Sequence, residues 1–537
     1  MIARVSFAIL LGLPLAAAPV FAAAPGGSGI TKAVPAAPAK PVEEPVFQLP
    51  ELVIVGENQA RILAQKEQFS SSPLKGLREA PLLEKEENSI AALRLRAPVA
   101  LSGTEREGVA GALRLEGGSP LWGGGALWLG RLRPGSALAL EAEASGLRGD
   151  GTSGGTAGGR DLGVAVSFAR TGMGSASLGW RERARDLPAQ SKTAERQLDR
   201  LQLAGEIAGY GGGAALAGAK VARLASPQGG INAAALAASA EWPAWAGAAT
   251  ALTVRPRAEA ELADKAGKHA RLGADAEAAW IPSERMRAFA GVAADDAFGG
   301  GLAAWSIQPR AGAAWTFEAG WTVEAAFAPG FRVPWLTAQA EAVPYAWFTA
   351  APVPERDRVD ATLAAWIQHV DGSGFRAAYR YRDTMDALTW RERLAQGLWE
   401  PATLASLRMH ELRLSAELRQ LKPAVFTAEG AWRSIETVGG RAANLPQAEG
   451  VLGASWTRGG FTAGTGLKIV GVRPRDVASA GNDLPASADW SVTLAWRPTK
   501  RWELYGRAGN LLGEPVQAWG GYPDPARLIT LGARLAF

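Results

Sequence analysis

Histidine is the residue type in this sequence best suited to act as a general base or to bind a metal. There are only three, His269, His369 and His410, and the chain has no cysteine. No two of the histidines form a close pair or stand at a spacing typical of metal ligands. We therefore expect no metal site, no disulfide and no thiolate chemistry.

A hydrolase would need a nucleophile within reach of one of these histidines. Asp275 and Glu277 follow His269 and could orient it, but no Gly-x-Ser-x-Gly turn nominates a serine. Glycine-rich stretches such as 123–125 adjoin expected strands, whereas a phosphate-binding loop would open a helix. The sequence predicts that the protein is not an enzyme and has no cofactor.

Charged residues that share one face of an expected strand are the more promising functional feature, because alternate residues of a strand face the same side. The main candidates are Arg255, Arg257, Glu259, Glu261, Arg376, Arg380, Arg382, Glu411, Arg413 and Glu417. Inside a barrel they could line a hydrated pathway that binds or selects polar solutes. The alternative is a solvated wall whose charges pair across strands. The three arginines at 376, 380 and 382 are the strongest candidate for attracting anions.

The elements that would carry these side chains are strands. From about residue 108 to the end, segments of roughly 10 to 15 residues alternate apolar and polar positions. Within residues 252–262, Leu252, Val254 and Leu262 share one face, while arginines and glutamates occupy the other. Gly, Pro, Asp and Asn separate the segments, as turn residues do.

Strand length and aromatic placement favour a membrane barrel over a soluble sandwich. Strands of soluble sheets most often have about 5 to 6 residues, whereas a tilted membrane strand needs about 9 to 11. Trp490 and Trp496 share a face with Val492 and Leu494, as in an apolar band with aromatic rims. We predict an all-β fold, a single antiparallel transmembrane β-barrel of about 20–22 strands (16–22 possible) over residues 106–537.

The N-terminal region has a different composition. Residues 1–24 have the charged start, apolar stretch and small-residue end of a secretory signal peptide. A Pro/Ala-rich linker is expected over 25–50, and a short periplasmic or reduced-plug segment over 51–105. The formal net charge is only +5 with no dense basic run, so nucleic acid is not an expected partner. The longest irregular stretch of the barrel, Pro329 to Arg356, predicts an extended extracellular loop or a pair of short strands.

Several motifs resemble those of TonB-dependent outer-membrane receptors. The closing residues Asn510-Leu511, a loop with Tyr522 and Arg527, and a last strand ending in Phe537 are similar to that family's closing hairpin. Gly330–Pro334 resembles its Phe-Arg-x-Pro element, and Pro354–Arg356 its Lys-Pro-Glu element. The resemblance implies location in the bacterial outer membrane, contact with its lipid, and recognition of Phe537 by the barrel-assembly machinery.

The resemblance also bears on the N-terminal segment. The stretch Glu51, Leu52, Val53, Ile54 and Val55 is similar to the box by which these receptors pair with an energy-coupling periplasmic protein through strand addition. Its alternative reading is a β-prone island in a tail. The segment before the first strand is much shorter than the plug of a typical receptor, which puts active import in doubt.

Two functions follow from these features. The first is transport or binding of a small solute across the outer membrane, passive or with a reduced plug. The alternative is an outer-membrane anchor that recruits a periplasmic partner through residues 45–70.

Overall fold

The computed structural model describes residues 108–537 apart from short gaps. The gaps are residues 120–121, 134–135, 148–157, 171–173, 188–194, 209–213, 227–228, 248, 265–266, 284, 300–301, 318–319, 344, 350–351, 370–371, 394–397, 479–480, 482, 515, 520–521 and 524–526. The predicted signal peptide, linker, reduced-plug segment and receptor-like box at residues 51–55 lie outside the described residues.

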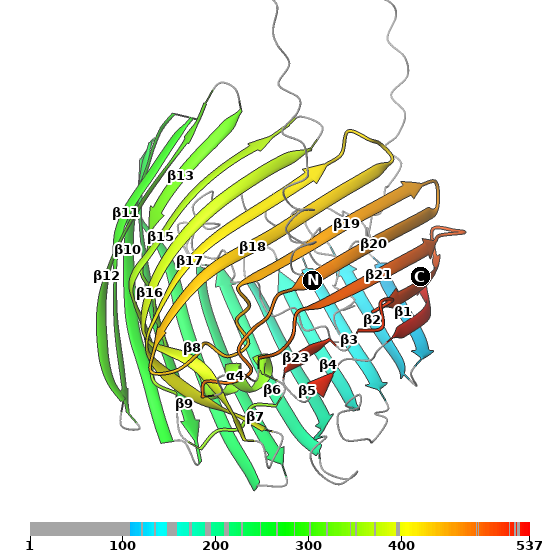
Figure 1. The fold of residues 1–537 in the computed structure, drawn as a ribbon, viewed down its shortest axis with the longest axis horizontal. Coiled ribbons are helices and arrows are strands. Elements are labelled where there is room, and N and C mark those ends of the chain that lie inside the picture. The colour runs from blue at the N-terminus through cyan, green and yellow to red at the C-terminus, as the bar shows by residue number, and fades with distance from the viewer. Residues whose placement is uncertain are drawn as a thin grey trace, which may run out of the picture. The chain divides into compact units, whose positions relative to one another are not determined.

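Long strands make up nearly all of the described chain (Figure 1). The first twelve are β1 (Gly108–Ser119), β2 (Trp122–Arg133), β3 (Ser136–Leu147), β4 (Gly159–Arg170), β5 (Gly174–Asp186), β6 (Glu195–Ala208), β7 (Ala214–Ser226), β8 (Gly229–Ala246), β9 (Thr250–Ala263), β10 (Gly267–Ser283), β11 (Met286–Gly299) and β12 (Leu302–Thr316).

The remaining elements include one short helix. They are β13 (Trp321–Phe327), β14 (Phe331–Arg332), α4 (Leu336–Ala342), β15 (Glu355–Gln368), β16 (Gly374–Arg393), β17 (Leu398–Leu418), β18 (Ala424–Val438), β19 (Ala448–Arg458), β20 (Phe461–Val470), β21 (Ser487–Trp496), β22 (Trp502–Gly509), β23 (Gln517–Trp519), β24 (Tyr522–Pro523) and β25 (Leu528–Ala536). No helix of the described residues is long and apolar enough to cross a membrane.

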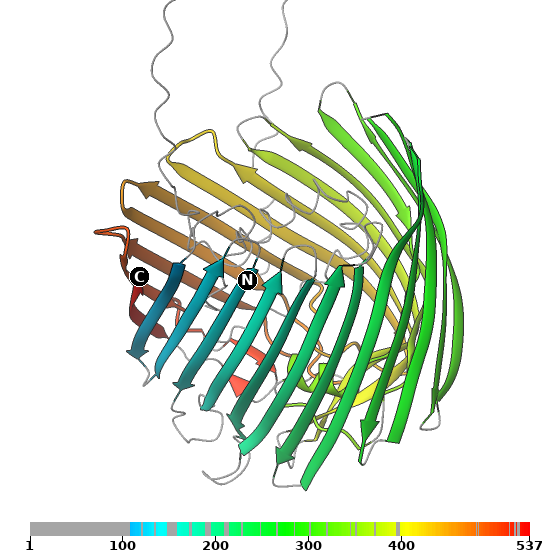
Figure 2. The same ribbon diagram turned by 180° about the vertical axis from the view of Figure 1, so that it is seen from behind.

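All strands except β23 and β24, which pair only with each other, form one closed antiparallel sheet, seen from two sides in Figures 1 and 2. Each strand pairs with its neighbours in sequence, and β25 pairs with β1 to close the ring, with Ala536 opposite Ala112. β14 continues the line of β13 along β15, so the 23 strands of the sheet make a 22-strand barrel. The predicted all-β barrel of 20–22 strands is confirmed. Closure pairs the first strand of the sheet with the last one, as a membrane-spanning sheet requires.

The outward face is apolar, as the alternation predicts. Trp490, Leu494 and Trp496 are 42%, 48% and 51% exposed on the outer surface of β21. Other tryptophans are exposed near short turns, namely Trp245, Trp280, Trp315 and Trp502. Together with Trp496, these four tryptophans form an aromatic girdle at the level of the short turns, which is typical of a membrane-spanning barrel.

The connections differ between the two rims of the barrel. One rim, the turn rim, has short connections such as 284–285 and 459–460. The other, the loop rim, carries the long connections 328–354, 471–486 and 510–527. Bacterial outer-membrane barrels have short periplasmic turns and longer extracellular loops.

The segment between Pro329 and Arg356 differs from the expected extended loop. Besides the two-residue strand β14 it contains the helix α4, and its side chains are largely buried. We call residues 331–343 and 345–348 the cap segment. Because most of its large residues are apolar, it packs against the barrel wall and does not extend into solvent.

Candidate functional site

The cap segment forms an apolar cluster at the loop rim. The cluster comprises Leu187, Leu198, Ala222, Leu224, Ile231, Ala233, Ala263, Leu336, Ala340, Val343, Tyr345, Ala346, Trp347, Phe348, Trp390, Leu398, Trp399 and Trp519. Its wall residues come from β6–β9 and from β16–β17. In a ring of 22 strands, β7 and β17 lie on opposite sides. The cap segment therefore bridges the mouth of the barrel, and Figure 1 shows α4 and β23 within that region.

A buried carboxylate of the wall binds the start of α4. Trp335 precedes the helix and supplies no side-chain cap. Instead, Glu261 of β9 accepts hydrogen bonds from the backbone N–H groups of Leu336 (2.8 Å) and Thr337 (2.9 Å). A carboxylate is favourable at a helix N-terminus, where backbone N–H groups lack partners within the helix. Residue Glu261, predicted to line a pathway, thus anchors the cap segment.

A histidine supports the same carboxylate. Nε2 of His269 lies 3.4 Å from Glu261, and the imidazole stacks on Trp335 with ring centroids 5.9 Å apart. The indole of Trp335 also donates a hydrogen bond to Glu259 (3.2 Å). His269 and Glu259 therefore bind the cap segment together with Glu261.

Two arginines bind the other end of α4. The fully buried Arg196 of β6 donates hydrogen bonds to the carbonyl oxygens of Ala340 and Ala346, each at 3.0 Å. Arg183 of β5 donates to the carbonyl of Glu341 at 3.2 Å. Cations are favourable where helix carbonyls lack partners. The wall thus places a carboxylate at the start of the helix and two guanidinium groups at its end.

The side chain of Glu341 adds ion pairs to this attachment. Its carboxylate lies 2.9 Å from Arg200 and also contacts Lys220. All three side chains are partly exposed, so solvent and salt screen these pairs. We call the contacts of Glu261, Arg183, Arg196, Arg200 and Lys220 with the cap segment the latch.

Backbone pairing holds the cap segment to the opposite wall. The N–H of Trp347 donates to the carbonyl of Trp399 (2.8 Å), and the N–H of Trp399 donates to Tyr345 (3.0 Å). The Trp399 ring meets Trp519 at 5.1 Å, and Trp390 meets Trp519 at 5.8 Å, both edge to face. Trp519 belongs to the connection between β22 and β25, so a second loop takes part in covering the mouth.

The two receptor-like motifs lie side by side. Phe331 pairs with Arg356, and Arg332 with Glu355, where β14 runs along β15. The guanidinium of Arg332 lies 3.0 Å from Glu355 and 2.7 Å from Asp357. These contacts fix the point at which the chain leaves the wall and enters the mouth.

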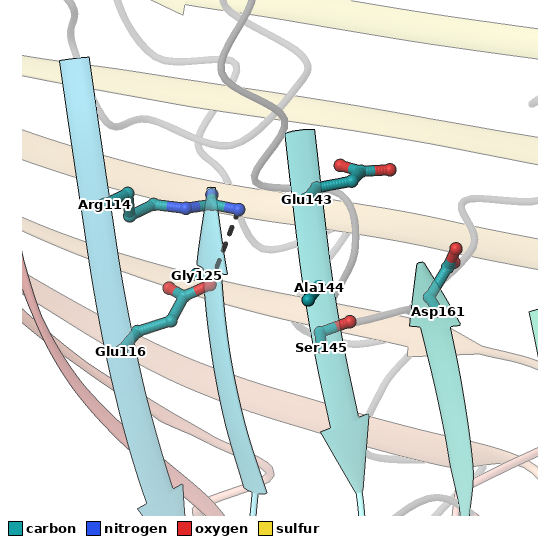
Figure 3. Close-up of a pocket in the computed structure, with 7 residues that line it drawn as sticks. All are labelled: Arg114, Glu116, Gly125, Glu143, Ala144, Ser145 and Asp161. Carbon is teal, nitrogen blue, oxygen red and sulfur yellow. Dashed lines mark ion pairs between the residues drawn. The ribbon is translucent and has the colours of Figure 1, made fainter. Parts of the chain in front are cut away.

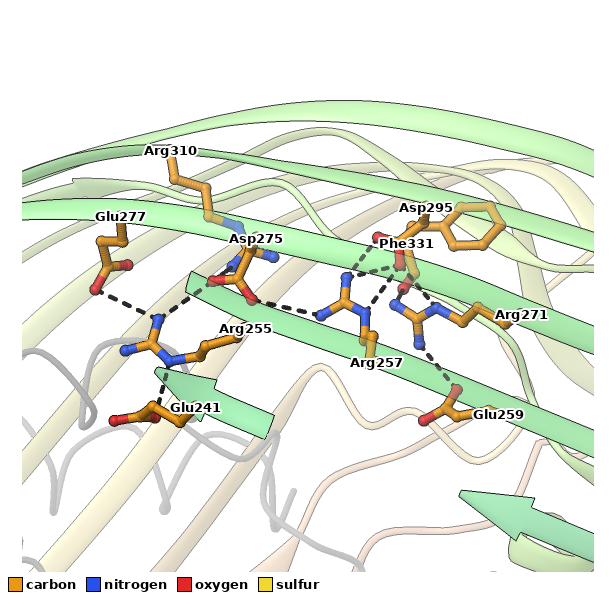
Figure 4. A network of polar contacts seen from close by, with 10 residues as sticks. All are labelled: Glu241, Arg255, Arg257, Glu259, Arg271, Asp275, Glu277, Asp295, Arg310 and Phe331. Carbon is orange, nitrogen blue, oxygen red and sulfur yellow. Dashed lines mark hydrogen bonds and ion pairs between the residues drawn. The ribbon is translucent and has the colours of Figure 1, made fainter. Parts of the chain in front are cut away.

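The inward faces of β8–β12 carry a connected network of charges (Figure 4). Arg255 lies 2.9 Å from Glu241 and 3.2 Å from Asp275, and Arg257 lies 2.6 Å from Asp295. Arg271 bridges Asp295 to Glu259, and it donates to the carbonyl of Phe331 in the cap segment at 3.0 Å. The network therefore continues from the wall into the cap segment.

The predicted anion-attracting arginines on β16 also have partners. Arg376 lies over the ring of Trp366 at 5.5 Å. Arg380 donates to Asp360 at 2.7 Å, and Arg382 lies 3.5 Å from the same carboxylate. On β17, Glu411 is 2.6 Å from Arg433 and 3.1 Å from Arg413, and Glu417 contacts Arg419. The ten candidates share the inward faces of their strands, and the pairs described here form both along one strand and between neighbouring strands.

A small hollow lies in the wall at β1–β4. Arg114, Glu116, Gly125, Glu143, Ala144, Ser145 and Asp161 line it (Figure 3). Arg114 and Glu116 form an ion pair at 3.6 Å. No group of histidine and carboxylate side chains in the described part of the chain has the geometry to hold a metal ion.

The sequence reasoning did not select Arg183, Arg196 or Lys220 as site residues. Arg196 shares its face with Leu198 and Arg200 at alternate positions, so the inward orientation was available from the pattern. Their partners were not, because those partners are backbone carbonyls or a side chain more than a hundred residues away. Residues 45–70, the predicted recruiting segment, lie outside the described residues.

The barrel has the fold of TonB-dependent outer-membrane receptors. It is similar to an iron transporter, FrpB from Neisseria meningitidis (F5-1 variant; TM-score 0.65, 10% identity, 80% of this chain and 83% of that chain). It is also similar to the copper transporter OprC (0.63, 14%, 80% and 81%) and to the siderophore receptor PirA from Acinetobacter baumannii (0.62, 9%, 80% and 81%). No protein-family model and no curated protein matches the sequence.

Proposed function

We propose that the protein is an outer-membrane transporter that moves or binds a small solute, passively or with a reduced plug, and that its mouth is closed by the latched cap segment. The apolar outer band supports the membrane location, and the signal-peptide pattern of residues 1–24 supports export. The long connections would then face the cell exterior, with the cap segment on that side.

The attachment of the cap segment is the observation that carries this proposal. One side of the cap segment is bound by charged side chains, several of them partly exposed, and not by a continuous sheet. The ion pairs of Glu341 with Arg200 and Lys220 can exchange for water or for a polar solute at modest cost, since exposed ion pairs contribute only about 0–1 kcal/mol each. The buried contacts of Glu261 and Arg196 open only where another polar group replaces them. A structural barrel with no transport role would not require a closure of this kind.

We also propose that the protein is not an enzyme. His269 contacts the carboxylate of Glu261 and stacks on Trp335. Nδ1 of His410 lies 2.6 Å from the hydroxyl of Tyr379, a residue exposed on the outer surface. Neither histidine lies beside a serine or threonine hydroxyl in these contacts. The similar structures named above are transporters and a siderophore receptor, which supports the same proposal.

Conductance in planar lipid bilayers tests the transport function. We expect the wild-type protein to conduct little, and Glu261→Ala or Arg196→Met to raise the open probability by releasing the cap segment. Arg223→Met is the matched control, because Arg223 is exposed on β7 and has no role in the latch. A barrel that stays silent in every variant, with and without residues 25–105, contradicts the proposal.

A closed reference comes from a tether. Because the chain has no cysteine, Ala222→Cys and Ala340→Cys can be linked by a short bis-maleimide between β7 and α4. Linking should abolish the conductance gained in Glu261→Ala. Persisting conductance would show that ions pass elsewhere than through the capped mouth.

A further inference from the structure

The barrel wall parts between β12 and the strand that follows it. β12 and β13 pair from Thr316↔Thr322 up to Ala311↔Phe327, and no described strand pairs with this edge of β12 above that point. Residues 328–330 remain hydrogen-bonded to β15: the N–H of Ala328 donates to the carbonyl of Asp360, and the N–H of Asp357 donates to the carbonyl of Gly330. Residues 328–332 therefore follow β15 and leave β12.

Two prolines explain the position of the split. The N–H of Phe317 donates to Trp321, so the odd-numbered residues of β12 direct their backbone groups toward β13. Ala311↔Phe327 is one of these directly bonded pairs, and the same register would next place Pro309 opposite Pro329. Proline has no N–H to donate. Neither partner can form its bond, so the ladder ends there.

The unpaired edge lies in the part of the wall that faces lipid. Trp305 and Ile307 are 69% and 62% exposed on the outside of β12. Trp315, in the girdle at the turn rim, is ten residues from Trp305, which is about 25 Å along the barrel axis for a strand tilted by about 40°. The backbone groups of Ile307 thus point along the wall in the outer half of the apolar band, where lipid offers no hydrogen bonds, and those of Trp305 and Ala303 continue the open edge at the outer rim of the band.

Apolar side chains cover the inner side of the same edge. Phe331 and Val333 of the cap segment are buried with Ala297 of β11, and Ala304 of β12 and Trp335 pack on them. The seam between β12 and residues 328–333 is therefore closed by side-chain packing and not by backbone hydrogen bonds. Packing of this kind can part without breaking a sheet ladder.

We propose that this seam is a lateral portal that admits an apolar or amphipathic molecule bearing an acyl chain from the outer leaflet to the inner side of the wall. Both faces of the seam are apolar, from Trp305 and Ile307 outside to Phe331, Val333 and Trp335 inside. An acyl chain matches these apolar side chains. The buried amide of Gln308, which shares the inward face of β12 with Ala304, and Arg271, which donates to the carbonyl of Phe331, are polar partners for the head group of an amphipathic molecule. The inside of the seam is built from the cap segment, so entry of a ligand would act directly on the closure of the mouth.

A second copy of the chain is the competing occupant of an open strand edge. Pairing of two copies would need donors along the whole edge, and Pro309 interrupts them. The bulky exposed side chains at 305 and 307 also suit lipid contact. A lipid-like occupant is therefore the better match to this edge.

Photolabelling in nanodiscs tests the portal. The probe is palmitic acid carrying a diazirine near its methyl end, and labelled peptides are read by mass spectrometry. We expect label on residues 331–335 as well as on 305 and 307. Closing the seam with a short bis-maleimide between Ala304→Cys and Val333→Cys should reduce label at Phe331 and Trp335 about tenfold, because the chain can then reach only the outer surface.

Matched controls separate closure of the seam from other effects. Ala313→Cys with Ala325→Cys places the same linker across a paired position of β12 and β13, and should leave the label unchanged. Pro309→Thr with Pro329→Thr supplies the missing donors and should lower the label without any linker, whereas Pro256→Thr on β9 should not. Label confined to 305 and 307 in the wild type, or label insensitive to both closures, would overturn the proposal.

The oligomeric alternative has its own readout. Trp305→Cys tests for a dimer. A disulfide between two copies at low protein concentration, without fatty-acid label on residues 331–335, would assign the edge to a dimer and overturn the portal. The labelling result does not depend on conductance, so failure of the portal leaves the transport proposal standing, and silence in bilayers does not remove the label.

Discussion

The phenol of Tyr505 on β22 donates a hydrogen bond of 2.7 Å to Glu116 on β1, and it crosses β25 to do so. Its ring lies over Gly532, where a Cβ atom would stand 2.3 Å from Cζ of the tyrosine. One side chain therefore ties together three strands at the point where the ring closes. The absence of a side chain at Gly532 is what allows it.

Gly532→Val should prevent this arrangement and impair closure. The added Cβ would meet the ring at a distance that real contacts do not show, and the tyrosine would have to leave Glu116. We expect less of the compact, heat-modifiable form on an unheated gel. Gly466→Val on β20 is the control, because its Cβ would meet its nearest atom at an ordinary 3.5 Å. Equal folding of both variants would show that the crossing is dispensable.

Tyr505→Phe separates the hydrogen bond from the ring. It keeps the packing on Gly532 but leaves Glu116 with one partner fewer. A lost hydrogen bond to a buried charged group costs about 1–3 kcal/mol. A urea titration of the refolded barrel should show a lower midpoint with an unchanged slope. An unchanged midpoint would mean that water replaces the phenol without loss.

Phe537→Ala should weaken assembly of the barrel where β25 closes on β1. The backbone of Phe537 exchanges two hydrogen bonds with Gly111 (2.7 and 2.9 Å), and its ring lies over that glycine. The substitution keeps the backbone bonds and removes the ring, so the role of the ring as an assembly signal can be read from the yield in membranes. A yield equal to that of Leu535→Ala, the neighbour on the same outward face, would contradict a special role.

Arg196→Met should loosen the cap segment while leaving the barrel intact. The buried carbonyls of Ala340 and Ala346 would lose their donor, at a cost of about 1–3 kcal/mol for each buried group. Thiol labelling of Ala340→Cys measures the result, since this position is only 4% exposed. Labelling should be faster in the Arg196→Met background and unchanged with Arg223→Met. Equal rates would show that apolar packing alone holds the cap segment.

An exposed ion pair between two long connections should respond to acid. Arg441 donates hydrogen bonds to both oxygens of Asp483, and these bonds lower the pKa of Asp483 below its usual range. A depressed pKa in the folded state gives a stabilisation that is present above the ordinary aspartate value, about 3.9, and lost as the pH falls through the folded-state pKa. Hydrogen exchange of 439–447, corrected for its intrinsic pH dependence, should rise there in the wild type and not in Asp483→Asn.

The alternation of side chains was enough to predict the barrel, since one face of each strand must meet lipid and the other must not. It placed Leu494 outward and Glu411 inward because parity alone decides the face. The latch could not be predicted in this way. Arg196 reaches carbonyls some 144–150 residues away, and only the path of the cap segment brings them together.

The split at β12 shows the same limit more sharply. Pro309 and Pro329 are both visible in the sequence, and each alone indicates only an edge or a turn. Their effect depends on being opposite one another, which requires the register Ala311↔Phe327. Strand registers follow from the turns and from neighbouring strands, so a single sequence without its pairings does not reveal the coincidence. The expected extended loop at 329–356 was wrong about the helix for a related reason, because burial of its apolar residues needs a wall that the local sequence does not contain.

The pairing of β1 with β25 has a consequence for connectivity. Gly111 and Phe537 face each other where β1 pairs with β25, so both ends of the barrel lie at the same rim, a few residues apart. The β1–β25 pair differs from the other strand pairs only in lacking a connecting turn. A short linker from Phe537 to Gly108, with new ends opened at 459–460 on the same rim, should give a circularly permuted chain with the same strand neighbours. Joining ends that are already adjacent adds little loop entropy, so the ring has an order of strands but no obligatory first strand.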